Sequence, residues 1–146
     1  MGLTIAALQY CSCDDADTTI AHIEPLIAKA AKKARLVCLP EAANFLAASR
    51  AQLQSCAEWE DDSASLNKLA AIAHYHKIWL LAGSIFLRRR HDGQLVNRSL
   101  LFTPQGQNTA IYDKIHMFDA NVGDNKRYCE SESFVAGTEP VIAAVD

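Results

Sequence analysis

Three ionisable residues stand where their chemistry could be used. Glu41 follows Pro40 directly after the short apolar run 36–39, and α/β proteins tend to present site residues at the carboxyl ends of buried strands. Lys114 is an ammonium group among large apolar residues, and Glu130 follows it sixteen positions later. A carboxylate can carry a proton and an ammonium group can stabilise developing negative charge, so this set suits acid–base chemistry.

Each of these residues also has an ordinary structural explanation. Glu41 taken alone fits a solvent-facing loop carboxylate. Lys114 taken alone fits an exposed lysine paired with Asp113 or Asp119. Glu130 taken alone is unremarkable. The functional interpretation therefore depends on whether the three residues occur together in one pattern.

The five cysteines offer no clear nucleophile or metal site. Cys11 and Cys13 are separated by one residue, whereas zinc-binding pairs are separated by two to four, and no second pair answers them. Cys38 falls in an expected buried strand. Cys129, next to Glu130, is the best candidate nucleophile of the five, but nothing in its neighbourhood would lower the thiol pKa. We expect reduced thiols, and no metal.

The bulk composition predicts one globular domain over residues 1–146. Half of the residues are hydrophobic, 21% are charged, and the formal net charge is −3. This charge gives no general attraction for nucleic acid or anionic membrane, and the basic run Arg88, Arg89, Arg90, His91 fits a solvated turn. The chain shows neither a run of about 18 apolar residues nor a basic signal-peptide start. We expect a cytoplasmic protein that binds neither nucleic acid nor membrane.

Hydrophobic periodicity predicts an α/β domain in which buried strands position the three residues. We expect strands at 4–9, 36–39, 78–87, 94–102 and 108–112, with a further strand beginning at 140–145. One helix is expected after the N-cap candidates at 14–18, with apolar positions from 20 to 34 and a kink or restart at Pro25. Another is expected after the cap at 61–63 and ends near His76. The turn at Asp92 and Gly93 predicts a hairpin. Residues 42–60 are expected to mix loop with short helix, and 115–138 to form a long ordered loop.

Several segments together resemble the nitrilase superfamily of carbon–nitrogen hydrolases. Leu39-Pro40-Glu41 resembles the strand end that carries the family's general base. Residues 112–119 are similar to the lysine motif of the branch containing ω-amidase and deaminated glutathione amidase, and Glu130 falls where that branch has a second glutamate. Residues 136–140 look like the family's "pGxxp" segment, and Asn97 lies in a strand similar to its Asn-bearing strand. The resemblance extends from Ile5 to Val145.

The resemblance implies an amidase that cleaves a small non-peptide amide through a cysteine thioester. Glu41 would be the base, Lys114 would stabilise the oxyanion, and Glu130 would hold Lys114, without metal or organic cofactor. The implied fold is the N-terminal half of a four-layer αββα sandwich, and the complete form would be a homodimer. The family's nucleophilic cysteine would lie beyond Asp146, so we expect these 146 residues alone to be inactive and marginally stable in solution.

Two alternatives come from other functional classes. A catalytically inactive nitrilase-fold subunit, or pseudo-enzyme, would keep the fold for assembly. The sequence beyond Asp146 separates this alternative from an enzyme, because an enzyme requires a motif such as Cys-Tyr-Asp there. An unrelated α/β ligand-binding domain is disfavoured, since no glycine-rich phosphate loop occurs in the chain.

Overall fold

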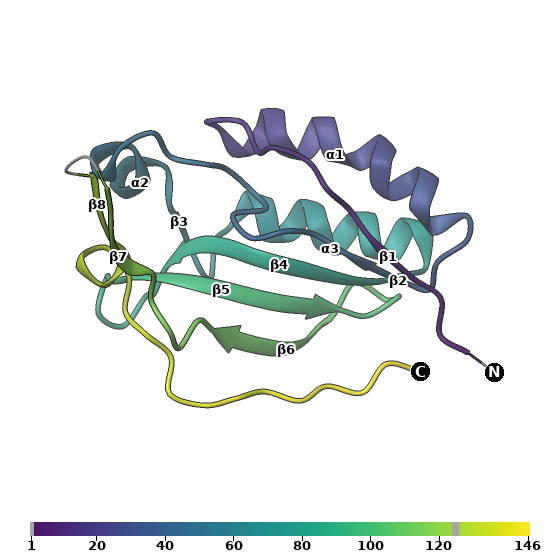
Figure 1. Ribbon diagram of the computed structural model, residues 1–146. Helices are drawn as coiled ribbons and strands as arrows, with labels where there is room; N and C mark the ends of the chain where they lie inside the picture. The colour runs from purple at the N-terminus through teal and green to yellow at the C-terminus, as the bar shows by residue number, and fades with distance from the viewer. Residues whose placement is uncertain (1, 124–125) are drawn as a thin grey trace.

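A mixed sheet covered on one face by two helices forms the domain (Figure 1). The computed structural model describes residues 2–123 and 126–146, without the side chains of residues 122 and 126. The elements in chain order are β1 (Ile5–Ala7), α1 (Ala16–Ala31), β2 (Leu36–Cys38), α2 (Arg50–Cys56), β3 (Glu58–Trp59), α3 (Ala64–His76), β4 (Trp79–Arg88), β5 (Leu95–Phe102), β6 (Asn108–Asp113), β7 (Asp119–Val122), β8 (Lys126–Cys129) and the 3-10 helix η1 (Glu130–Glu132).

The main sheet has the strand order β1-β2-β4-β5-β6, and β3 also pairs with β4. β1, β2 and β4 are parallel, whereas β4, β5 and β6 are antiparallel. The predicted hairpin is confirmed: β4 and β5 are joined through a turn in which Gly93 has φ +70°, a conformation that favours glycine. The register shifts between Ala82 and Ile85, so β4 contains a bulge.

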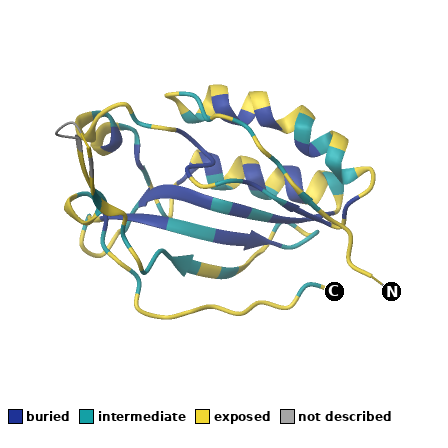
Figure 2. Ribbon diagram, viewed as in Figure 1, coloured by how far each residue is buried: buried dark blue, intermediate teal, exposed yellow. Residues whose placement is uncertain are grey.

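Helix α1 runs as one helix from Ala16 to Ala31, so the predicted restart at Pro25 is wrong, whereas the predicted kink stays a prediction. Asp15 begins the helix by accepting a hydrogen bond from the Thr18 backbone N–H. Pro25 is exposed. Figure 2 shows that α1 has an exposed side, drawn in yellow, and a buried side, drawn in dark blue. Ala21, whose carbonyl would accept from an N–H at position 25, is also exposed, and the buried residues on either side keep the helix on the sheet.

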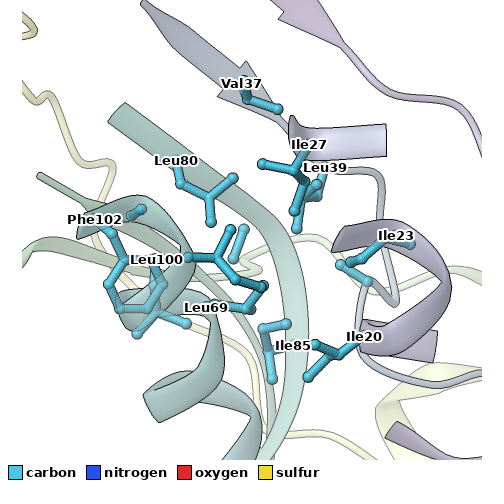
Figure 3. Packing of buried hydrophobic residues seen from close by; sticks show 14 of the residues in the cluster. Ile20, Ile23, Ile27, Val37, Leu39, Leu69, Leu80, Ile85, Leu100 and Phe102 are labelled. Carbon is cyan, nitrogen blue, oxygen red and sulfur yellow. The ribbon is translucent and has the colours of Figure 1, made fainter. Parts of the chain in front are cut away.

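The core lies between the two helices and the sheet. Isoleucines from α1 pack against Leu69 of α3 and against Leu80 and Leu100 of the sheet (Figure 3). Ser63 begins α3 by accepting from the Leu66 backbone N–H, and Lys77 ends it in the left-handed conformation. The apolar residues recur on one face of each helix, which is why the sequence predicts both helices.

The opposite sheet face carries a smaller apolar cluster and an extended C-terminal segment. Leu36, Trp79 and Leu101 form this cluster, and Val145 packs against it. The predicted strand at 140–145 is wrong: no strand is assigned there, although the segment lies along this face (Figure 1). Side-chain contacts, such as the 3.2 Å hydrogen bond from Trp79 Nε1 to Asp146 Oδ1, hold it, whereas a strand requires a backbone ladder.

Residues 115–138 are not the single long loop that the sequence predicts. β7 and β8 pair antiparallel there, with Asp119 opposite Cys129, and η1 follows. Both strands are short and polar, so the apolar alternation that identifies a strand is missing. The predicted mixture of loop and short helix at 42–60 is confirmed by α2, although the range also contains the two-residue strand β3. In the described part of the chain, no helix is long and apolar enough to cross a bilayer.

Candidate active site

The three residues singled out from the sequence converge on one ammonium group. Lys114 Nζ lies 2.9 Å from Glu41 Oε1 and 2.7 Å from Glu130 Oε2. The side chains of Lys114 and Glu130 are about three-quarters buried, whereas that of Glu41 is 60% exposed. Residues from the ends of β2, β6 and β8 thus form one partly open cluster of two carboxylates and a cation.

Hydrogen bonds between Ser84, in the β4 bulge, and the loop after β2 position Glu41. Ser84 Oγ accepts a 2.9 Å hydrogen bond from the Ala42 backbone N–H, and the Ser84 carbonyl accepts from Ala43 N at 2.7 Å. Ser84 N in turn donates to the Pro40 carbonyl at 3.2 Å. Ala42 has φ +53°, a conformation that L-residues rarely adopt, so the surrounding contacts must hold it. These contacts fix the backbone on both sides of Glu41.

Gly83→Ala is expected to destabilise the protein severely, because it disrupts the packing of the β4 bulge against the loop after β2. A Cβ at position 83 would lie 2.0 Å from the Leu39 carbonyl oxygen and 2.5 Å from that of Pro40. Because both contacts are backbone atoms, β2 and β4 would have to separate, and we expect a loss of about 3 kcal/mol or more in unfolding free energy. Urea denaturation measures it. Gly2→Ala is the control, since a Cβ there meets nothing within 4 Å; equal stability of the two variants would contradict the close approach.

Backbone contacts fix Lys114 at the end of β6. Its N–H donates to the Asn97 carbonyl at 2.9 Å, and its carbonyl accepts from Gly137 N at 2.9 Å. The alternative pairing with Asp113 or Asp119 is wrong. Asp113 binds Arg98 instead, through Nε at 2.6 Å and Nη2 at 3.0 Å, and Asp119 accepts from the backbone N–H that follows Glu130. The lysine is therefore left to the two glutamates.

Glu130 ties the lysine motif to η1. Its Oε2 accepts both from Lys114 Nζ and from the Phe118 backbone N–H, each at 2.7 Å. Its own N–H donates to the Phe118 carbonyl at 3.2 Å. Glu130 thus fixes the backbone of residues 114–118 as well as the ammonium group.

The cluster holds Glu41 and Lys114 in the charged state. The hydrogen bond from Lys114, together with one from Asn97, lowers the pKa of Glu41 below its ordinary value, and these contacts outweigh partial burial. Burial alone would lower the pKa of Lys114, but the hydrogen bonds to Glu130 and Glu41 outweigh it and raise that pKa. At neutral pH the site therefore combines a carboxylate able to accept a proton with a permanent positive charge.

Asn97 also belongs to the site, although it was not among the three residues predicted from the sequence. Its Nδ2 donates to Glu41 Oε1 at 3.0 Å, and the side chain is buried. The sequence contains one indication of this role: Asn97 is a polar amide side chain within the largely apolar segment 95–102, which resembles the family's Asn-bearing strand. The bond spans 56 positions in sequence, so its partner could not be identified without the fold.

In the described part of the chain, no cysteine thiol hydrogen-bonds with Glu41, Lys114 or Glu130. Cys129 Sγ contacts Ser131 Oγ at 3.4 Å and Arg127 Nη2 at 3.6 Å. Burial raises the pKa of the Cys38 thiol, which disfavours its nucleophilic form. All five thiols are free. Within residues 2–123 and 126–146, no group of three His, Cys, Asp or Glu side chains could hold a metal ion.

Comparison with known proteins places this chain in one class. The sequence pattern of the carbon-nitrogen hydrolases matches residues 4–146, so the chain belongs to the carbon–nitrogen hydrolase family. It is 34% identical over 141 residues to deaminated glutathione amidase of Yersinia enterocolitica, covering 95% of this chain and 49% of that protein. It is 30% identical to the chloroplastic omega-amidase of Arabidopsis thaliana, covering 97% of this chain and 39% of that protein.

Solved structures support the nitrilase-like fold. The crystal structure of the Caenorhabditis elegans NitFhit protein superposes with a TM-score of 0.83 at 29% identity, covering 97% of this chain and 35% of that one. The crystal structure of Saccharomyces cerevisiae Nit3, a member of branch 10 of the nitrilase superfamily, superposes with a TM-score of 0.77, covering 94% of this chain and 49% of that one. At 24% identity, this likeness concerns the fold alone. The chain spans half or less of the length of these relatives.

Proposed function

We propose that this chain supplies the base, the cation and the supporting glutamate of an amidase site that hydrolyses a small non-peptide amide. The observation that carries the proposal is the contact of one ammonium group with two carboxylates, at 2.9 Å and 2.7 Å. The amidase names of relatives in the same family support it. Those relatives make a short dicarboxylic monoamide the first substrate to try.

The proposed reaction proceeds through a thioester. A cysteine from outside these 146 residues gives its proton to Glu41, and its sulfur attacks the amide carbon. Lys114 stabilises the oxyanion that forms on the former carbonyl oxygen. The C–N bond then breaks as Glu41 returns the proton to the leaving nitrogen. Water next attacks the thioester and gives a proton to Glu41, and the thiol leaves with that proton, so Glu41 is restored.

Glu130 acts in this proposal on Lys114 rather than on the substrate. An ammonium group on a flexible side chain stabilises an oxyanion only if its position is fixed beforehand. Glu130 provides this with one oxygen that also binds the Phe118 backbone. Glu41 is the more exposed carboxylate, so it is the one available to a thiol and a substrate.

The two charged groups should not titrate near neutral pH. Because the pKa of Glu41 is lowered from 4.5 and that of Lys114 is raised from 10.5, the pair stays intact between these values. The stabilisation from ionised Glu41 is present above its unfolded-state pKa and is lost as pH falls through its lower folded-state pKa; it is small because the side chain is exposed. Carbon NMR of the Glu41 carboxyl is expected to give a midpoint below 4.5. A midpoint above that value would contradict the pairing.

Ammonia release from a short dicarboxylic monoamide tests the proposed function. We expect no release from the 146 residues alone and release when the chain is completed through the relatives' length, either by extension or by a separate C-terminal complement. Release from the chain alone would show that a resident cysteine acts. A folded, completed protein that binds the amide without cleaving it would favour the non-catalytic subunit. Dimerisation and a cytoplasmic location stay predictions.

A further inference from the structure

Asn97 contacts both members of the proposed base–cation pair. Its side chain donates to Glu41 Oε1 at 3.0 Å, while its backbone carbonyl accepts from the Lys114 backbone N–H at 2.9 Å. Lys114 Nζ donates a hydrogen bond to the same Glu41 oxygen at 2.9 Å. The three residues thus close a ring of contacts from the end of β2 through β5 to the end of β6.

The orientation of the Asn97 amide follows from its partner. An ionised carboxylate only accepts hydrogen bonds, so the NH2 group must face Glu41 and the carbonyl oxygen must point the other way. That oxygen, Asn97 Oδ1, is buried and has no partner among the described residues. An unsatisfied buried acceptor costs stability, and the neighbours Leu95 and Val96 are fully buried apolar residues. The fold alone would favour an apolar side chain at position 97.

The two oxygens of Glu41 are unequal as a result. Oε1 accepts hydrogen bonds from both Lys114 Nζ and Asn97 Nδ2, whereas Oε2 has no hydrogen-bond donor within the described parts of the chain. A proton added to the carboxylate would go to the oxygen whose lone pairs are free. Glu130, the other carboxylate of the cluster, binds Lys114 through its own Oε2 and forms no hydrogen bond with Glu41 in the described part of the chain.

We propose that Asn97 is a positioning residue that anchors Glu41 Oε1, so that Oε2 is the oxygen that exchanges the proton. It acts through Glu41 and makes no contact with substrate. The importance of this anchoring for hydrolysis rests on the proposed function; the anchoring itself does not. The two parts can therefore fail separately.

The first test needs no change to the buried asparagine. In the unmodified chain, the Asn97 side-chain NH2 signals in a nitrogen–proton NMR spectrum are expected to shift with the same midpoint as the Glu41 carboxyl. In Glu41→Gln this shift should vanish, while exposed Asn67 on α3 should follow neither titration. Asn97 NH2 signals that ignore the charge on Glu41 would overturn the proposal, whether or not the protein is an amidase.

The second test separates positioning from structural support. Asn97→Leu removes both the donor and the unpaired oxygen, so we expect an unchanged or higher Tm together with an upward shift of the Glu41 pKa. In the completed protein, kcat should fall about 10- to 100-fold with little change in KM, because the base is misplaced but binding is kept. Asn67→Leu is the matched control. An unmoved Glu41 pKa in folded Asn97→Leu would overturn the proposal; if that variant does not fold, the first test decides.

Discussion

Lys114→Ala in the completed protein is expected to lower kcat about 100- to 1000-fold, which corresponds to roughly 3 to 4 kcal/mol of transition-state stabilisation. The ammonium group is held between two carboxylates at 2.9 Å and 2.7 Å, so it is fixed before the oxyanion forms. Removing it should slow the formation of the thioester and of product alike. Single-turnover kinetics with a short dicarboxylic monoamide measures the effect.

Folding of the Lys114→Ala variant should be nearly unaffected. Its ion pairs are partly exposed, so the loss in unfolding free energy should stay within about 1 kcal/mol. Lys68→Ala is the matched control, because Lys68 forms an exposed ion pair with Asp17 at 2.7 Å, far along the chain from the cluster. Unchanged turnover in folded Lys114→Ala, or an equal loss in Lys68→Ala, would refute the oxyanion assignment.

Glu41→Gln is expected to stop acylation. The amide that replaces the carboxylate can still accept from Asn97 and Lys114, so the local geometry should survive, but it cannot take the proton of the attacking thiol. We expect the rate of thioester formation to fall about 10²- to 10⁴-fold, the range that a positioned acid–base group contributes. Mass spectrometry of the intact protein after mixing with substrate measures the acyl-enzyme.

The control for Glu41→Gln is Glu24→Gln on the exposed face of α1. It makes the same chemical change away from the cluster and should acylate normally. Thioester accumulation at the normal rate in Glu41→Gln would show that another group accepts the proton. The carboxylate would then have only a role in holding Lys114.

The parts of the fold that the sequence predicted are those with strong local patterns. The apolar run 36–39 gave a buried strand, and Asp92 with Gly93 gave the hairpin. The apolar residues of α1 at helical spacing gave a helix, and it continues through Pro25 without the restart that the sequence predicted. The residues packed against α1 belong to the tertiary structure and are not visible in the local sequence.

The parts that the sequence missed either lack apolar alternation or depend on partners far along the chain; β7 and β8 are of the first kind, because they are neighbours in the chain and pair with each other. β7 and β8 carry little apolar alternation, and residues 140–145 have an apolar pattern without a backbone ladder. The site shows the same limit. The motif resemblance identified Glu41, Lys114 and Glu130. The hydrogen bond from the Ala42 backbone N–H to Ser84 Oγ spans 42 positions, and no local pattern indicates it.

A crystal structure of the completed protein, trapped as its thioester, tests the central claim most directly. We predict that the thioester oxygen lies within hydrogen-bond distance, about 3 Å, of Lys114 Nζ, and that Glu41 turns its free oxygen towards the sulfur and the water that attacks. Both carboxylates should still bind the ammonium group. A thioester oxygen bound by other donors, with Lys114 directed into solvent, would contradict the hydrolase account of this cluster.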